Sequence, residues 1–144
     1  MRDSADKILQ SPEALLAWRR QMRAEKRDLV VTNGCFDLLH AGHVSYLQEA
    51  RKLGGALLVG LNGDDGVREL KGPERPVNTE ADRALVLAAL ECVDAVRVFP
   101  ERSAENLLRA VQPDIYVKGG DYTVETIPQN ERRAVESAGG RIVF

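Results

Sequence analysis

The most informative stretch of this sequence is Asn33-Gly34-Cys35-Phe36-Asp37-Leu38-Leu39-His40-Ala41-Gly42-His43. It follows the apolar, β-branched run 29–32, which is typical of a buried strand. It precedes apolar residues that recur at helical spacing over 44–53, where two glycines end the pattern. The stretch therefore predicts a tight turn from a strand into a helix, with two histidines at the mouth of that helix.

The N-terminus of a helix is a good anion site because it presents unpaired N–H groups and the positive end of the helix dipole. His40 and His43 are three residues apart, so both can point at the same anion, and Gly42 lets the backbone approach a ligand closely. The alternatives are one capping and one surface histidine, or a metal site with Cys35. Zinc usually takes three or four ligands, so we favour the anion site and expect no metal site.

The overall composition narrows the class of protein. A chain of 144 residues fits one domain, and a net charge of −2 argues against nucleic acid as the main partner. No apolar run reaches membrane-spanning length, and no signal-peptide core is present. Cys35 and Cys92 lack metal-type spacing, and a reducing compartment is their default setting. We expect a cytoplasmic protein that binds neither nucleic acid nor membranes.

The order of the apolar runs predicts an α/β fold. The run 56–61 forms a strand–helix–strand unit with 29–32, so these two strands should be parallel with a right-handed crossover. Further strands are predicted at 95–99, 114–117 and 141–144. Ahead of them, Ser11-Pro12 begins an amphipathic helix, which we interpret as an N-terminal packing helix within residues 1–28.

Two polar segments follow strands of this sheet, where ligands of parallel sheets bind. The first, 62–79, is predicted to be a long functional loop, in which Lys71 and Arg75 suit a phosphorylated substrate. We assign Asn62, Asp64, Lys71 and Arg75 to substrate binding, against the alternative of a merely solvated loop. The second is Lys118-Gly119-Gly120-Asp121, where glycines permit close approach and charged side chains flank them.

The turn Gly34-Cys35-Phe36-Asp37, followed by His40-Ala41-Gly42-His43, resembles the signature of the H-x-G-H nucleotidyltransferases, the cytidylyltransferase-like superfamily. The Leu-Lys-Gly-x-x-Arg-Pro pattern at 70–76 and the segment 118–122 resemble its heptose 1-phosphate adenylyltransferase branch. The resemblance covers roughly residues 29–144. It implies a nucleotidyltransferase domain there, with a Rossmann-like three-layer sandwich of the HUP type around a parallel sheet.

The resemblance also implies a reaction, the transfer of AMP from ATP to a sugar 1-phosphate, with Mg²⁺ bound mainly through the triphosphate. The catalytic residues it implies are His40, His43, Lys71 and Arg83. The nucleotide-binding residues it implies are Gly34, Cys35, Phe36, Asp37, Gly42, His43, Lys118, Gly119 and Asp121. Arg83 has an alternative interpretation as a surface arginine paired with Asp82. A cytidylyltransferase for glycerol 3-phosphate, a non-catalytic nucleotide-binding module and a ligand-free domain are the competing functions.

Family members usually continue into a Ser-Thr-Thr segment that opens a final helix and contacts the nucleotide phosphates. These 144 residues contain no such segment, so the sequence is either part of a longer protein or has a weaker phosphate site. A homodimer is a further expectation, with the helix at 11–25 and an exposed sheet edge as its surfaces.

Overall fold

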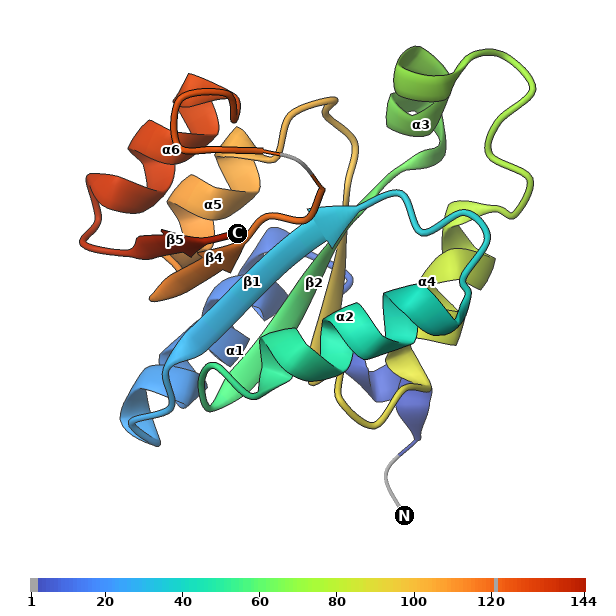
Figure 1. Ribbon diagram of the computed structural model, residues 1–144. Helices are drawn as coiled ribbons and strands as arrows, with labels where there is room; N and C mark the ends of the chain where they lie inside the picture. The colour runs from blue at the N-terminus through green and yellow to red at the C-terminus, as the bar shows by residue number, and fades with distance from the viewer. Residues whose placement is uncertain (1–2, 121) are drawn as a thin grey trace.

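The computed structural model describes residues 3–120 and 122–144 and shows a five-stranded, wholly parallel sheet in the order β3-β2-β1-β4-β5 (Figure 1). The strands are β1 Leu29–Gly34, β2 Ala56–Asn62, β3 Ala95–Phe99, β4 Ile115–Val117 and β5 Arg141–Val143. Each coincides with a predicted strand, and the predicted β1–β2 pairing is parallel with Leu29 opposite Ala56. The predicted α/β class is therefore confirmed.

Helices cover both faces of the sheet and complete the predicted three layers. The helices are η1 Ser4–Lys7 (a 3₁₀ turn), α1 Pro12–Ala24, α2 Ala41–Arg51, α3 Asp64–Lys71, α4 Glu80–Ala88, α5 Glu105–Val111 and α6 Gln129–Glu136. On β1, Leu29 and Val31 pack toward α1, α5 and α6, whereas Val30 packs toward α2 and α4. Burial on both faces explains why these strands are apolar without alternation.

The N-terminal helix α1 is part of this core. It begins where predicted, with Ser11 Oγ accepting from Ala14 N at 3.1 Å and proline in the first turn. The buried Arg19 donates through Nε to Val111 O at 2.8 Å, which fixes α1 against the end of α5. Within residues 3–120 and 122–144, each helix is too short or too polar to span a bilayer.

The segment 62–79 contains α3, so its prediction as a continuous loop was wrong. Asp64 and Asp65 lie in the first turn of α3 and Arg68 and Lys71 in the last, which suits the helix dipole. Few apolar residues hold this helix, and Val67 is its only buried hydrophobic side chain among those described. Figure 1 shows α3 standing away from the sheet, beyond the end of β2.

The strand order places a crevice at the carboxyl ends of β1 and β4. From β1 the chain goes to β2 on one side, and it later crosses back to β4 on the other side. Ligands of open parallel sheets bind outside the strand ends at such a reversal. The turn 33–43 begins at the end of β1, and Lys118 follows β4, so both predicted segments meet at this point.

Candidate active site

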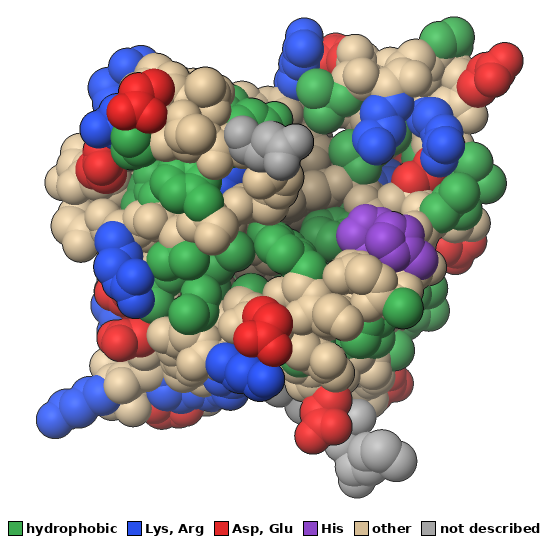
Figure 2. Space-filling model, viewed as in Figure 1, with side chains coloured by type: hydrophobic (Ala, Val, Ile, Leu, Met, Phe, Trp, Pro, Cys, Tyr) green, Lys and Arg blue, Asp and Glu red, His purple; other side chains and the backbone are tan. Residues whose placement is uncertain are grey.

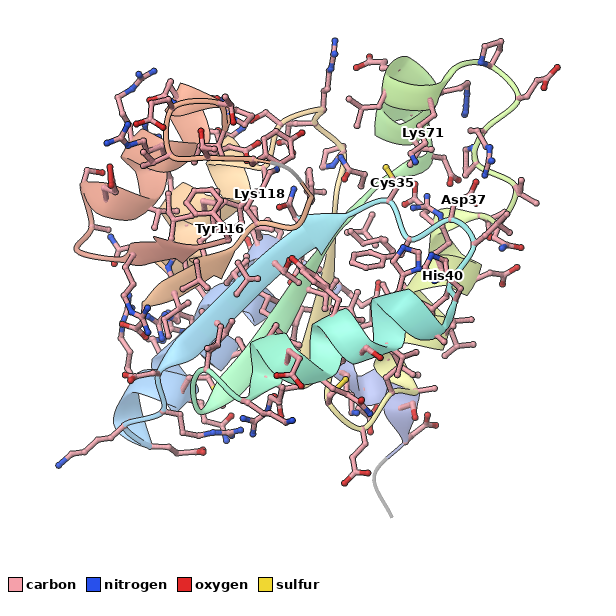
Figure 3. All side chains as sticks on the ribbon, viewed as in Figure 1. Cys35, Asp37, His40, Lys71, Tyr116 and Lys118 are labelled. Atoms are coloured by element: carbon pink, nitrogen blue, oxygen red, sulfur yellow. The ribbon has the colours of Figure 1, made fainter. Side chains whose placement is uncertain are left out.

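A cavity of about 520 Å³ opens at this reversal. It is bordered by the turn after β1, by Lys71 and Arg75 from α3 and the loop that follows it, and by Lys118–Gly120 after β4. Figure 2 shows the histidines exposed at the rim of a hollow, and Figure 3 shows how the labelled side chains gather around the end of β1. The structure thus brings together the three segments that the sequence singled out.

The two histidines form a reciprocal cap at the start of α2. His40 is the N-cap residue and its Nδ1 accepts from Gly42 N at 3.0 Å, while His43 Nδ1 accepts from His40 N at 3.2 Å. The ring centroids are 3.9 Å apart. A neutral imidazole that accepts at Nδ1 carries its proton on Nε2, so each ring keeps an N–H donor that the described residues do not use.

The surroundings of His43 favour this neutral form. Burial, followed by the charges of His40 and Lys71, lowers the pKa of His43. Phe36 contacts the His43 ring edge-on at a centroid distance of 5.4 Å and has a left-handed backbone with φ of 45°, a strained conformation for a bulky residue. A Cβ on Gly42 would lie 2.8 Å from the His40 ring, so this glycine makes room for His40.

Asp37 holds the loop that follows α3. Its side chain is 4% exposed, and its carboxylate accepts from Val77 N and Asn78 N at 2.9 and 3.0 Å and pairs with Arg75 Nη1 at 2.8 Å. Burial alone would raise its pKa, but the hydrogen bonds from Asn78, Arg75 and Val77 lower the pKa of Asp37 to about 2. Both oxygens of Asp37 are thus used within the protein, and its expected contact with nucleotide stays a prediction.

We expect Asp37→Asn to destabilise the fold by about 2 kcal/mol near pH 7, because a depressed pKa of this size corresponds to that free energy. The folded-state pKa lies below the unfolded value, so the contribution is complete above about pH 4 and is lost as pH falls toward about 2. Urea unfolding of the wild type and the variant along this pH series measures the effect.

The matched control is Asp65→Asn, since Asp65 has a 92% exposed side chain in an i,i+3 pair with Arg68. It should change the free energy of unfolding by less than about 0.5 kcal/mol. Equal effects of the two substitutions, or a difference independent of pH, would contradict the anchoring role of Asp37.

Arg83 is not among the residues that border this cavity, and it borders a separate, smaller one together with Phe36 and Asp37. Its side chain is 1% exposed and its guanidinium donates four hydrogen bonds of 2.7–3.0 Å. The acceptors are the carbonyl oxygens of Cys35, Asn62 and Asn78 and a carboxylate oxygen of Asp64. Arg83 therefore ties together the ends of β1 and β2 and the first turns of α3 and α4. Its burial contradicts the alternative of a surface pair with Asp82, whereas the expected phosphate contact stays a prediction.

Asp64 is likewise not brought to the cavity. Its Oδ1 pairs with Arg83 Nη2 at 2.8 Å and accepts from Glu80 N at 2.8 Å, while Asp64 N donates to Glu80 Oε1. These reciprocal bonds join the N-termini of α3 and α4. The carboxylate of Asp64 therefore has a role in the scaffold, and its expected role in substrate binding stays a prediction.

The remaining predicted residues that the structure describes border one of two cavities at the end of β1. Gly34, Cys35 and Phe36 border the first cavity, and burial raises the pKa of the Cys35 thiol. Asn62 borders a second cavity of about 500 Å³, which also contacts Cys35 and Lys118. Asp121 lies outside the described residues.

Glu131 on α6 is a buried carboxylate beside the second cavity that the sequence analysis did not identify. Its Oε1 lies 3.5 Å from Lys118 Nζ and accepts from the Tyr116 hydroxyl at 2.9 Å. A glutamate in an amphipathic helix looks like any solvated charge, so the sequence carried no signal for this contact.

Comparison with known proteins agrees with this architecture. The cytidylyltransferase-like family model matches residues 31–141. The bifunctional protein HldE of Geotalea uraniireducens is 51% identical over 138 residues, and that of Syntrophotalea carbinolica is 54% identical over 120 residues. These alignments cover 96% and 83% of this chain but only 28% and 24% of the relatives, so the chain spans about a quarter of their length.

Two solved structures share the fold. A lipopolysaccharide core biosynthesis protein from Thermoplasma volcanium has a TM-score of 0.68 and 28% identity, covering 81% of this chain and 94% of that one. Pantoate-beta-alanine ligase from Francisella tularensis has a TM-score of 0.60 and 13% identity, covering 94% and 65%. The family match includes both the H-x-G-H turn and the segment after β4, and the chain belongs to the cytidylyltransferase-like family.

Proposed function

We propose that this domain transfers AMP from ATP to a sugar 1-phosphate, namely D-glycero-β-D-manno-heptose 1-phosphate, and that residues 29–144 form the nucleotidyltransferase unit on which residues 1–28 pack. A phosphate oxygen of the sugar phosphate forms the new bond to the α-phosphorus, and the bond from that phosphorus to pyrophosphate breaks. The nucleophile is already anionic near neutral pH, so no general base is needed. Positioning and charge stabilisation then provide most of the catalysis.

The observation that carries this proposal is the pair of unused imidazole N–H groups at the rim of a cavity with basic side chains on two sides. His40 and His43 would donate to phosphate oxygens as charge develops, and Lys71, Arg75 and Lys118 would offset the charge of the triphosphate. The relatives named HldE and the resemblance at 70–76 and 118–122 support the heptose branch.

The two cavities suggest a division between the substrates. The cavity with the histidines would take the nucleotide, and the second cavity, which contacts Asn62, Ser103 and Asn130, would take the polar acceptor. The cavities share Lys118 and the end of β1, where the phosphates would meet. Asp37, the one carboxylate among the described residues of the first cavity, is already paired, so phosphate oxygens would hold Mg²⁺.

Pyrophosphate release tests this function. ATP and CTP are each combined with heptose 1-phosphate and with glycerol 3-phosphate in the presence of Mg²⁺, and release is expected only with ATP and heptose 1-phosphate. Release with CTP and glycerol 3-phosphate would instead establish the cytidylyltransferase alternative. If no pair reacts while ATP still raises the melting temperature, the domain is a nucleotide-binding module.

A further inference from the structure

Glu131 is a buried charge that the proposed reaction does not use. It is 4% exposed, and glutamate is rarely this buried unless it is paired. Both of its oxygens have partners. Oε1 faces Lys118 and Tyr116, as described above, and Oε2 accepts from Ala104 N at 3.3 Å and from Ser103 Oγ at 3.4 Å. The carboxylate is therefore held from both sides and has one fixed orientation.

Lys118 is the only one of these partners that faces both cavities. Its side chain is 15% exposed, and its Nζ lies 4.9 Å from the centroid of the Tyr122 ring. A carboxylate on one side and an aromatic face on another confine an otherwise flexible ammonium. In Figure 3, Lys118 and Tyr116 lie on the side of β1 opposite to His40, so the two groups of donors flank the strand end.

The same carboxylate reaches the end of β1 through Tyr116. The Tyr116 hydroxyl lies 2.9 Å from Glu131 Oε1 and 2.5 Å from Asn33 Oδ1, and it can donate its single proton to either oxygen. Burial, followed by the negative charge of Glu131, raises the pKa of Tyr116, so the phenol keeps this proton. Asn33 borders both cavities.

We infer that Glu131 is a positioning residue, which holds the ammonium of Lys118 at the junction of the two cavities, where the acceptor phosphate meets the α-phosphate. This inference rests on the proposed function. A merely structural alternative is that Glu131 serves only to satisfy Ala104 N at the start of α5. The positioning role depends on the negative charge of Glu131, whereas the structural role depends on the shape of its side chain.

Two substitutions separate charge from shape. Glu131→Gln keeps the shape and removes the charge, whereas Glu131→Asp keeps the charge and shortens the side chain by one methylene. We expect Glu131→Gln to lower kcat/KM for pyrophosphate release by about 10- to 100-fold, since misplacing a reacting group by about 1 Å costs this much. Glu131→Asp should lower kcat/KM by a smaller factor. If only packing mattered, Glu131→Asp would instead lower kcat/KM more than Glu131→Gln.

The matched control is Glu136→Gln, the same change on the same helix, where the exposed Glu136 pairs with Arg132. It should leave kcat/KM within about twofold of the wild type. Lys118→Met supplies a double-mutant cycle. If Glu131 acts through Lys118, adding Glu131→Gln to Lys118→Met should reduce kcat/KM by less than about twofold more.

A second readout needs no catalysis. Acylation of lysines by an N-hydroxysuccinimide ester, followed by peptide mass spectrometry, reports how readily each lysine side chain reacts through its free amine, the form that attacks the ester. Lys118 should be acylated at least about fivefold faster in Glu131→Gln than in the wild type, because its partner is gone. Lys52, which is exposed and pairs with Glu49 on α2, should react equally in both and serves as the internal control.

The outcomes distinguish the two proposals. An active wild type with additive effects of Glu131→Gln and Lys118→Met, or with unchanged acylation of Lys118, would overturn the positioning role and leave the proposed function intact. A wild type that releases no pyrophosphate with any substrate pair would overturn both, even if the acylation rates confirmed the ion pair.

Discussion

Replacing Arg83 with methionine is expected to lower the free energy of unfolding by about 3–5 kcal/mol, the largest stability effect we predict for a single residue. Methionine keeps much of the volume but none of the donors. Three carbonyl oxygens and the carboxylate of Asp64 would lose a charged partner in a buried or partly buried place, and unpaired buried polar groups are costly. Urea unfolding without ligand measures the loss.

The control is Arg109→Met, because Arg109 has a half-exposed side chain and pairs with Glu105 on α5 at 3.6 Å. Its effect should stay within about 0.5 kcal/mol. Melting of the Arg83 variant with and without ATP tests the phosphate contact that the resemblance implied for Arg83. If the unliganded variant kept wild-type stability but lost the rise in melting temperature caused by ATP, Arg83 would be a ligand contact and the structural interpretation would be wrong.

The strands of the sheet were predictable because burial on both faces requires continuous apolar runs in the sequence. A run such as 56–61 has to be apolar throughout when helices cover both sides. The turn 33–43 could also be predicted from the sequence, since it combines a strand end, a helix start and two histidines. Its location at the strand reversal follows from the topology, so the place of the site could be predicted.

Helix α3 was missed because its apolar signal is weak. Only Val67 and Leu70 are large apolar residues among its eight, Gly66 disfavours a helix, and Leu70 stays exposed. The usable signal was the charge pattern, with acids in the first turn and bases in the last. Hydrophobic periodicity alone cannot find a helix that rests on the core through a single buried side chain.

The partners of individual side chains could not be predicted, because they come from distant parts of the chain. Asp37 and Arg75 are 38 residues apart, and Tyr116 reaches Asn33 across 83. An arginine in the first turn of α4 was a real anomaly, since the helix dipole disfavours it. The sequence could not show that Arg83 donates to the carbonyl groups of Cys35 and Asn62 at the ends of two strands.

Replacing His43 with glutamine is expected to lower kcat/KM for pyrophosphate release by about 10²- to 10³-fold while the melting temperature stays within about 2 °C. Glutamine at the third position of a helix is the usual partner in a capping box, so it can still accept from His40 N. What it lacks is the imidazole Nε2–H at the rim of the cavity. Alanine at the same position would lose both the donor and the cap.

At His40, too, the N–H donor can be removed without losing the helix cap, because serine is a better N-cap residue than histidine. His40→Ser should therefore keep α2 intact and still lose activity by a similar factor, whereas His40→Ala should also lose about 1 kcal/mol of stability. If the glutamine and serine variants stayed active and only the alanine variants failed, the histidines would serve the helix alone. Loss of activity in folded, capped variants would show that the free N–H groups act on the substrate, as two donors preorganised by one helix terminus.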